Sequence, residues 1–183
     1  MTGTGQGLGG AWLPCPLMPG LVAAIFSALL IATGITKVIR PADTTRAVRV
    51  MGLPWAPLGT RALGMVEVVV GALVLMTASP SALFAQTGLY LVFLGFVVIA
   101  LRRDLPIASC GCLGRDDTPP YWGHVVLNLV GAGASVGAAL GGTITWGDGA
   151  LATVADVAIV ATGAFLAWNV LGISAVASAR RVM

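Results

Sequence analysis

Residues 21–39, LVAAIFSALLIATGITKVI, form an apolar run in which Lys37 is the one charged residue. About 20 helical residues, each rising 1.5 Å, span the roughly 30 Å of hydrocarbon in a bilayer. A backbone in lipid must pair its own polar groups, and an α-helix does this within a single segment. The stretch therefore predicts a membrane-spanning helix.

Four further apolar windows of similar length follow this first one. They lie at 60–78, 82–101, 122–141 and 150–174. Their frequent Gly, Ala and Ser residues favour close helix packing, and the alternating short strands of a barrel are not seen. We expect an all-α polytopic membrane helix bundle of about five transmembrane helices over 21–176, with a flexible N-terminal tail at 1–20 and a basic C-terminal tail at 177–183.

The segments between the windows contain helix-breaking residues and predict linkers. RPAD follows the first window, GLPWAPLGT precedes the second, ASPSA separates the second from the third, and TPPYWG precedes the fourth. We expect these segments to be turns and loops.

The composition supports a membrane protein and gives no support to nucleic-acid binding. The 183 residues are 57% hydrophobic and 9% charged, and the mean hydropathy is +0.95. Ten Lys and Arg against seven Asp and Glu give a formal net charge of +3, and these charges gather at segment ends. No basic face that could follow a phosphate backbone is present.

The positive residues predict how the chain is oriented in the membrane. With five spans, every Lys and Arg falls on one side. They are Lys37, Arg40, Arg46, Arg49, Arg61, Arg102, Arg103, Arg115, Arg180 and Arg181. Because positive residues favour the cytoplasmic side, we expect a multi-pass protein of the cell membrane with its N-terminus outside and its C-terminus in the cytoplasm.

The segment IASCGCLGRD, residues 107–116, holds the two cysteines that carry recognisable chemistry. Side chains two positions apart diverge on a helix and point to opposite faces of a strand, so Cys110 and Cys112 can meet only through a turn. Gly111 suits such a turn because it accepts positive φ and has no Cβ. A strained, accessible disulfide exchanges readily. The nearby Arg102, Arg103 and Arg115 would favour the thiolate, whereas Asp104, Asp116 and Asp117 oppose it.

The spacing of the cysteines leaves three readings open. Cys110 and Cys112 could be a redox pair, the two thiolate ligands of a soft metal ion, or small apolar residues at the membrane edge in a structural subunit of a larger complex. Cys15, in LPCPL, is either an unpaired bystander or a contact to an extracytoplasmic partner.

Three stretches together resemble the MauE family, the methylamine-utilisation branch of the DoxX-like redox-associated integral membrane proteins. These stretches are TGITKVIRP, RALGMVEVVVGALVL and SCGCLG, and the resemblance covers roughly residues 25 to 140. It implies a four-helix core and a thiol-disulfide oxidoreductase in which Cys110 and Cys112 exchange reducing equivalents with a thioredoxin-like partner. Such exchange would support the maturation of extracytoplasmic proteins, with Lys37 and Glu67 as polar positions that follow the family pattern.

Three intramembrane or membrane-edge residues are candidates for a supporting role. An ionised Glu67 within GMVEVVVGAL would be costly in lipid, so it should face the bundle interior and pair with Lys37 or Arg61, either to fix the packing or to accept protons. Lys37 could instead extend toward the headgroups. His124 is expected in the first turn of the fourth span, as a hydrogen-bonded group near the interface or beside the thiols.

No cofactor pattern is evident in the sequence. A quinone is compatible with membrane thiol chemistry, but no residue pattern supports one. The lipid bilayer and a thioredoxin-like protein are the expected partners.

Overall fold

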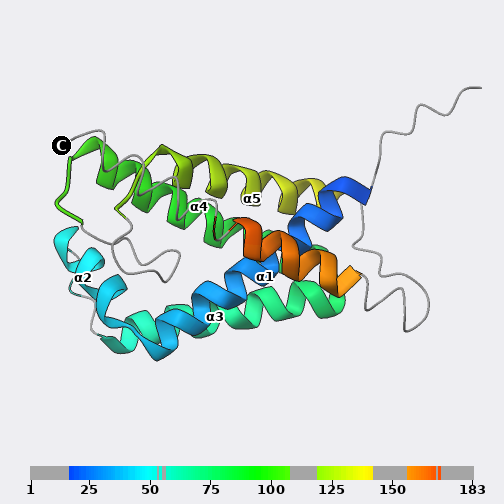
Figure 1. The fold of residues 1–183 in the computed structure, drawn as a ribbon, viewed down its shortest axis with the longest axis horizontal. Coiled ribbons are helices and arrows are strands. Elements are labelled where there is room, and N and C mark those ends of the chain that lie inside the picture. Colours follow the sequence, from blue (N-terminus) through cyan, green and yellow to red (C-terminus); the bar gives the residue numbers. More distant parts are fainter. Residues whose placement is uncertain are drawn as a thin grey trace, which may run out of the picture.

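The computed structural model describes residues 17–52, 54, 57–107, 119–141, 156–167 and 169, and these form helices and connecting turns without a strand. The labelled helices are α1 (Leu17–Ile39), α2 (Ala42–Val50), α3 (Pro57–Thr77), α4 (Pro80–Arg102) and α5 (Trp122–Gly141) (Figure 1). The predicted all-α membrane bundle is confirmed.

Four of the described helices are long and apolar enough to cross a membrane. They are α1, α3, α4 and α5, which lie roughly along one common direction (Figure 1). Contacts join α1 to α3, α3 to α4, α4 to α5 and α5 to α1, so the four helices close into a ring. Many of their large apolar side chains are exposed on the outside of the bundle, which suits a surface surrounded by lipid tails.

The buried face of α3 shows how this packing arises from the sequence. Its buried positions recur at alternating steps of four and three residues, the spacing of one helical face. These positions are Thr60, Gly64, Glu67, Gly71 and Val74. Small and polar residues therefore face the partner helices while the apolar residues between them face outward, the reverse of a soluble helix.

Prolines explain why three helices begin earlier than predicted. The windows started at 21, 60 and 82, whereas α1 begins at Leu17, α3 at Pro57 and α4 at Pro80. Pro19, Pro57 and Pro80 fall in the first turns, where a missing N–H costs nothing because these groups have no partner within the helix. At α4 the Ser79 hydroxyl completes the start by accepting a hydrogen bond from the Ala82 N–H. Pro57 and Pro80 begin α3 and α4, and Pro19 lies in the first turn of α1, so none of the three lies in a loop.

The short helix α2 corrects the prediction that residues 40–59 form a plain linker. Thr44, Thr45, Ala47 and Val48 are buried along one side of it, while Arg46 and Arg49 are exposed. The Thr45 hydroxyl hydrogen-bonds the Thr60 hydroxyl at 2.8 Å and so joins α2 to the start of α3. The segment is too short and too charged to resemble a membrane span, and the linker prediction overlooked its amphipathic pattern.

The end of α4 turns sharply back onto the bundle. Asp104 has a positive φ of 43°, and the Leu105 N–H donates to the Ala100 oxygen at 3.1 Å, a helix-ending arrangement usually built on glycine. Ile107 is thereby buried against Ala47 of α2 and Ala100 of α4. The chain that leads into the Cys-Gly-Cys segment is fixed to the end of the bundle up to residue 107.

The fifth predicted span, 150–174, lies partly outside the described residues. Within it the structure describes an apolar helix, Asp156–Ala167. Val160 of this helix belongs to the hydrophobic cluster formed by α1, α3, α4 and α5. A fifth crossing therefore stays a prediction, and so do the two tails.

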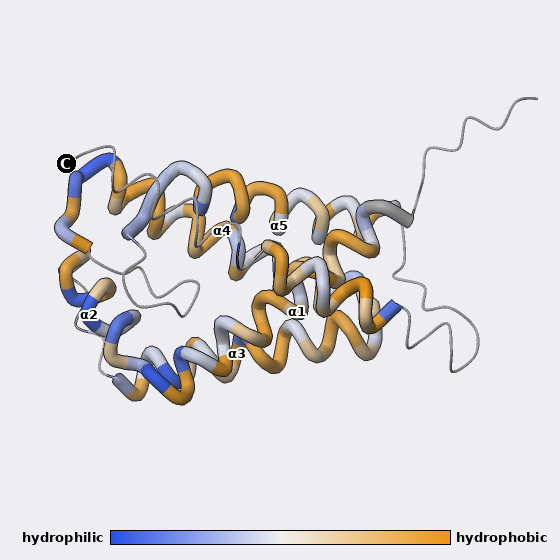
Figure 2. The backbone as a smooth tube through the Cα atoms, in the orientation of Figure 1, coloured by the Kyte–Doolittle hydropathy of each residue, from blue (hydrophilic) through white to orange (hydrophobic). Residues whose placement is uncertain are grey.

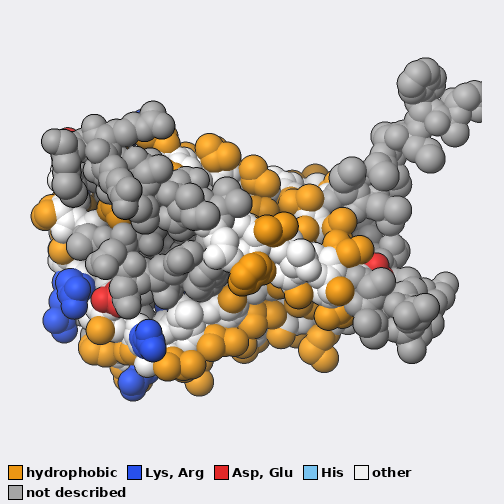
Figure 3. Space-filling view, in the orientation of Figure 1, with side chains coloured by type: hydrophobic (Ala, Val, Ile, Leu, Met, Phe, Trp, Pro, Cys, Tyr) orange, Lys and Arg blue, Asp and Glu red, His pale blue; other side chains and the backbone are white. Residues whose placement is uncertain are grey.

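The described Lys and Arg residues gather at one end of the bundle. Hydrophobic residues cover the long helices, and hydrophilic ones concentrate around α2 (Figure 2). The same end carries the Lys and Arg side chains visible on the face drawn in Figure 3. Arg40 follows α1, Arg61 lies near the start of α3, and Arg102 and Arg103 lie at the end of α4. Because successive spans run in opposite directions, these residues come to the same end of the bundle.

Candidate functional site

Two glycines bring α1 and α3 into close contact inside the membrane region. A Cβ on Gly34 would lie 2.6 Å from the Gly64 oxygen and 2.9 Å from the Glu67 Cβ, and a Cβ on Gly64 would lie 2.6 Å from the Gly34 oxygen and 3.0 Å from the Lys37 Cβ. Each glycine precedes a charged residue by three positions, in GITK and GMVE. Gly34 of α1 therefore leaves room for Glu67 of α3, and Gly64 of α3 leaves room for Lys37 of α1.

This contact seats a buried ion pair. The Lys37 Nζ donates a hydrogen bond to the Glu67 Oε2 at 2.8 Å, and the two side chains are 3% and 0% exposed. Lys37 therefore does not extend toward the headgroups, and the exposed Arg61 is not the partner. A charge in lipid is costly unless it is paired, so the pair binds α1 and α3 in a single register.

Neighbouring groups complete the surroundings of the pair. The Thr33 hydroxyl lies 3.1 Å from the Glu67 Oε2, and the Lys37 Nζ lies 5.2 Å from the centre of the Phe93 ring, within range of a cation–π contact. The Glu67 Oε1 is buried and has no hydrogen-bond partner among the residues that the structure describes. One oxygen of the carboxylate is thus fully engaged while the other retains acceptor capacity.

His124 faces the same interior from the opposite side of the bundle. It is 0% exposed, in the first turn of α5, and its ring packs edge-on against Tyr121 with centres 4.6 Å apart. The Asn128 amide, one turn further along, donates to the His124 oxygen at 2.6 Å. The predicted helical position of His124 is correct, but the residue lies inside the bundle instead of at its surface.

A second polar layer crosses the bundle further from the α2 end. The Gln86 amide of α4 accepts from Ser27 of α1 at 2.7 Å and donates to Ser135 of α5 at 3.0 Å and to the Ala23 oxygen at 3.2 Å. All its polar atoms are therefore engaged, as a buried amide requires. This layer ties three helices together and has a structural role.

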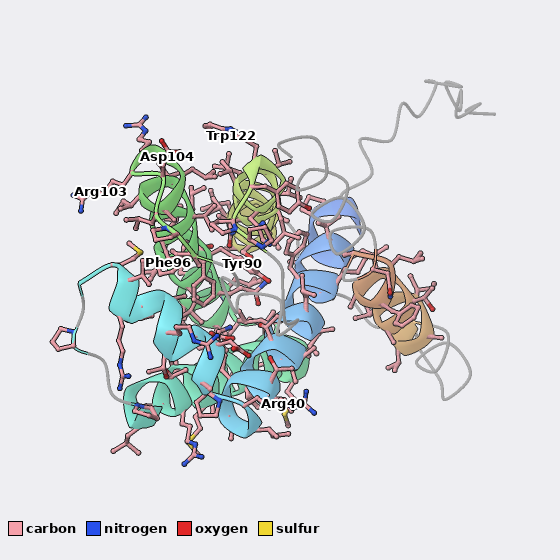
Figure 4. All side chains as sticks on the ribbon, turned by 60° about the vertical axis from the view of Figure 1, so that its left-hand side comes forward. Arg40, Tyr90, Phe96, Arg103, Asp104 and Trp122 are labelled. Atoms are coloured by element: carbon pink, nitrogen blue, oxygen red, sulfur yellow. The ribbon has the colours of Figure 1, made fainter. Side chains whose placement is uncertain are left out.

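The aromatic residue Tyr90 lies between the two polar layers. Its hydroxyl donates to the Phe26 oxygen at 2.7 Å, and its ring meets the Phe26 ring edge-on at 5.4 Å. Figure 4 shows the Tyr90 side chain inside the bundle, where α1, α4 and α5 approach one another. It lines the same interior as His124 and Thr33.

The cysteine residues lie outside the described residues. This holds for Cys110, Gly111 and Cys112 and also for Cys15. The structure brings together Lys37 and Glu67 from the predicted set and places His124 on the facing helix. In the part of the chain that it describes, no three His, Cys, Asp or Glu side chains gather as metal ligands.

Sequence reasoning missed Gln86 and Tyr90 as interior polar residues. A glutamine in PSALFAQTGLYLVF is itself a signal, because an amide in the middle of a span must find partners in neighbouring helices. Tyr90 gave no such signal, because tyrosine is also common at membrane interfaces.

Comparison with known proteins identifies the family. No curated protein and no solved structure shows significant similarity to the chain. Residues 16–144 match the family described as methylamine utilisation protein MauE, a range that covers the Lys37–Glu67 pair, the Cys-Gly-Cys segment and His124. With its four described candidate spans, this chain is a multi-pass membrane protein that belongs to the MauE family.

Proposed function

We propose that this protein is a membrane thiol-disulfide redox protein. In it Cys110 and Cys112 pass reducing equivalents to a thioredoxin-like partner, in support of the maturation of extracytoplasmic proteins. Gly111 provides the turn that lets the two sulfurs meet, and Lys37, Glu67 and His124 form the supporting interior. Membership of the MauE family is consistent with this role.

One observation carries the proposal, namely that both flanks of the Cys-Gly-Cys segment are held at the same end of the bundle. Ile107 is buried against α2 and α4, and Tyr121 packs against His124 at the start of α5. Three residues of chain reach at most about 11 Å, so covalent geometry keeps Cys110 within that distance of Ile107. A redox pair needs this kind of tethering at a surface where another protein can reach it.

The charges at this end favour the reactive form of a thiol. Arg102 and Arg103 end α4 a few residues before Cys110, and both are exposed. A nearby positive charge stabilises the thiolate, the species that attacks a disulfide. Asp104 opposes this effect, so we expect a moderate effect on thiol reactivity.

The exchange that we propose is balanced in bonds and electrons. The thiolate of one cysteine attacks a disulfide of the partner, breaking that S–S bond and forming a mixed disulfide. The second cysteine then attacks the mixed disulfide, closes the Cys110–Cys112 bond and releases the partner with two thiols. Two electrons and two protons pass to the partner, and a cytoplasmic thiol of the thioredoxin or glutathione class restores the dithiol.

Trapping of the mixed disulfide tests the proposal. In a Cys15→Ser background, Cys110→Ser and Cys112→Ser each leave one thiol of the pair. The variant that keeps the attacking cysteine cannot resolve the mixed disulfide, so a covalent complex with a thioredoxin-fold protein should accumulate and disappear on reduction. The variant lacking both cysteines is the matched control.

Two results together would overturn the proposal. The first is that neither single-cysteine variant traps a thioredoxin-fold partner. The second is that alkylation of the native pair does not differ between oxidised and reduced cells. A reduced pair that instead binds Cu⁺ or Zn²⁺ tightly would favour the metal-binding alternative.

A further inference from the structure

A small cavity lies between α1, α4 and α5, beside the ion pair. Its volume is about 20 Å³. Polar side chains on three helices border it, namely Thr33, Tyr90, His124 and Asn128, together with apolar residues of the same helices. A water molecule needs roughly 10–15 Å³ and two to four polar neighbours, and this cavity provides both.

The polar groups around the cavity have capacity left for a water molecule. The Tyr90 hydroxyl uses its proton on the Phe26 oxygen and can still accept, and Asn128 uses one N–H on the His124 oxygen and keeps its own oxygen as an acceptor. The Thr33 hydroxyl has one proton, which it shares between the Leu30 oxygen at 3.0 Å and the Glu67 Oε2 at 3.1 Å. Its lone pairs can accept from a water molecule on the cavity side.

Thr33 therefore stands between the cavity and the buried carboxylate. Thr33 borders the cavity, and its hydroxyl lies 3.1 Å from Glu67 Oε2. A hydroxyl that accepts a proton on one side and donates its own on the other connects two groups that do not touch. The titratable and charged groups that surround this point are Lys37, Glu67, Tyr90 and His124.

We propose that the cavity is a water-binding site and that water in it, acting through the Thr33 hydroxyl, carries protons between Glu67 and the His124 end of α5. In each transfer the water gives a proton to Thr33 while Thr33 gives its own to Glu67. One proton therefore enters this row of hydrogen-bonded groups for each proton that leaves it. No electron changes hands. The inference does not depend on what Cys110 and Cys112 do.

Proton exchange at Glu67 tests the transfer route directly. In full-length protein in lipid nanodiscs, Lys37→Met removes the counter-charge of Glu67, so this carboxyl becomes protonated and gives an infrared carboxylic-acid band. Adding Glu67→Gln must abolish the band, which assigns it. On transfer to D₂O the band should shift promptly, because cavity water reaches the carboxyl through Thr33.

Two substitutions of Thr33 separate the hydroxyl from the packing. Thr33→Val keeps the shape and removes the hydroxyl, so exchange of the Glu67 band should slow by an order of magnitude or more. Thr33→Ser keeps the hydroxyl and should leave the rate close to that of its parent. Equal rates in the Val and Ser variants, or no exchange with the cavity intact, would contradict the proposed route.

X-ray radiolytic labelling tests the water site in the unaltered chain. Hydroxyl radicals formed from bound water oxidise the aromatic rings beside it, so Tyr90 and Phe93 should be modified. Phe26 is buried in the same region and does not border the cavity, which makes it the matched control. If Tyr90 and Phe93 are labelled no faster than Phe26, the cavity is dry and the proposal is wrong. This test uses the unaltered protein, so it holds even if Lys37→Met does not fold.

Discussion

Glu67 and Lys37 are the carboxylate and the ammonium group that the described part of the bundle buries, and they pair with each other. Lys37 lies near the α2 end of α1, where its long side chain could have reached the headgroups. It turns inward because Gly64 leaves space for its Cβ and Glu67 offers a carboxylate at 2.8 Å. An ion pair surrounded by helices is expensive to break, since removing one partner leaves the other charge unmatched.

Substitution of one member of this pair should destabilise the protein strongly. We expect Lys37→Met to lower the free energy of unfolding by about 3 kcal/mol, because Glu67 must then stay unpaired or take up a proton. Glu67→Gln should have a comparable effect. Denaturant unfolding in detergent micelles, followed by circular dichroism, measures both.

The double variant Lys37→Met/Glu67→Gln is the control for this prediction. It removes both charges, so it should be more stable than either single variant. Additive losses in the double-mutant cycle would mean that the pair contributes no coupling energy and would contradict the role that we assign to it.

The contact between α1 and α3 determines the geometry of the interior at the scale of helices. Gly34 and Gly64 face each other. Further along, a Cβ on Gly71 would lie 2.7 Å from the Ile31 Cγ1 and 2.8 Å from the Ser27 oxygen. The helices can approach this closely only because these positions carry no side chain. The ion pair and the glycine contact are thus parts of one interface.

An added methyl group at this contact should push the helices apart. Gly34→Ala should lower the free energy of unfolding by about 1–3 kcal/mol, because the new Cβ would meet backbone that cannot move aside. Gly88→Ala in α4 is the matched control, since a Cβ there meets nothing within 4 Å and alanine is the better helix former. Thermal unfolding of the two variants side by side makes the comparison, and equal stability would contradict the close contact.

The packing of Ile107 against α2 and α4 should affect the reactivity of the cysteines that follow it. Ile107→Ala removes most of the side chain that fixes the chain to Ala47 and Ala100, so Cys110 and Cys112 should react several-fold faster with a maleimide in the reduced protein. Leu58→Ala, at an exposed position of α3, is the control and should leave the rate unchanged. An unaltered rate in Ile107→Ala would show that the contact does not restrain the segment.

The membrane-spanning helices could be predicted from the sequence, but the contacts between them could not. Four of the five apolar windows correspond to α1, α3, α4 and α5 because membrane insertion depends on local hydrophobicity. Glu67 was expected to pair, yet the choice of Lys37 over Arg61 depends on the Gly34–Gly64 contact, which arises only when two helices pack. The helix α2 and the interior role of Tyr90 were missed because both depend on tertiary packing.

At the scale of the whole molecule, the Lys and Arg residues that the structure describes gather at one end, where α2, the ends of α1 and α4 and the start of α3 meet. We propose that this end faces the cytoplasm, since positive residues are retained on that side during insertion. The Cys-Gly-Cys segment follows α4 directly and would lie there too, whereas Cys15 would lie outside.

Alkylation in intact cells tests this orientation. With single-cysteine variants, a membrane-impermeant maleimide should label Cys15 and leave Cys110 and Cys112 unlabelled until the membrane is opened. Prompt labelling of Cys110 or Cys112 from outside would reverse the orientation. The same reagent on opened membranes controls for thiols that are inaccessible for other reasons.

A redox titration measures whether Cys110 and Cys112 form a redox pair. In the full-length Cys15→Ser protein in nanodiscs, equilibrated with glutathione buffers of increasing oxidised fraction, the thiol content is read by alkylation and intact mass. We expect a single two-electron transition in which both thiols disappear together and mass falls by two hydrogens, with no such transition in Cys110→Ser or Cys112→Ser. Thiols that persist across the whole range, or that oxidise independently of each other, would show that Cys110 and Cys112 are not a redox pair.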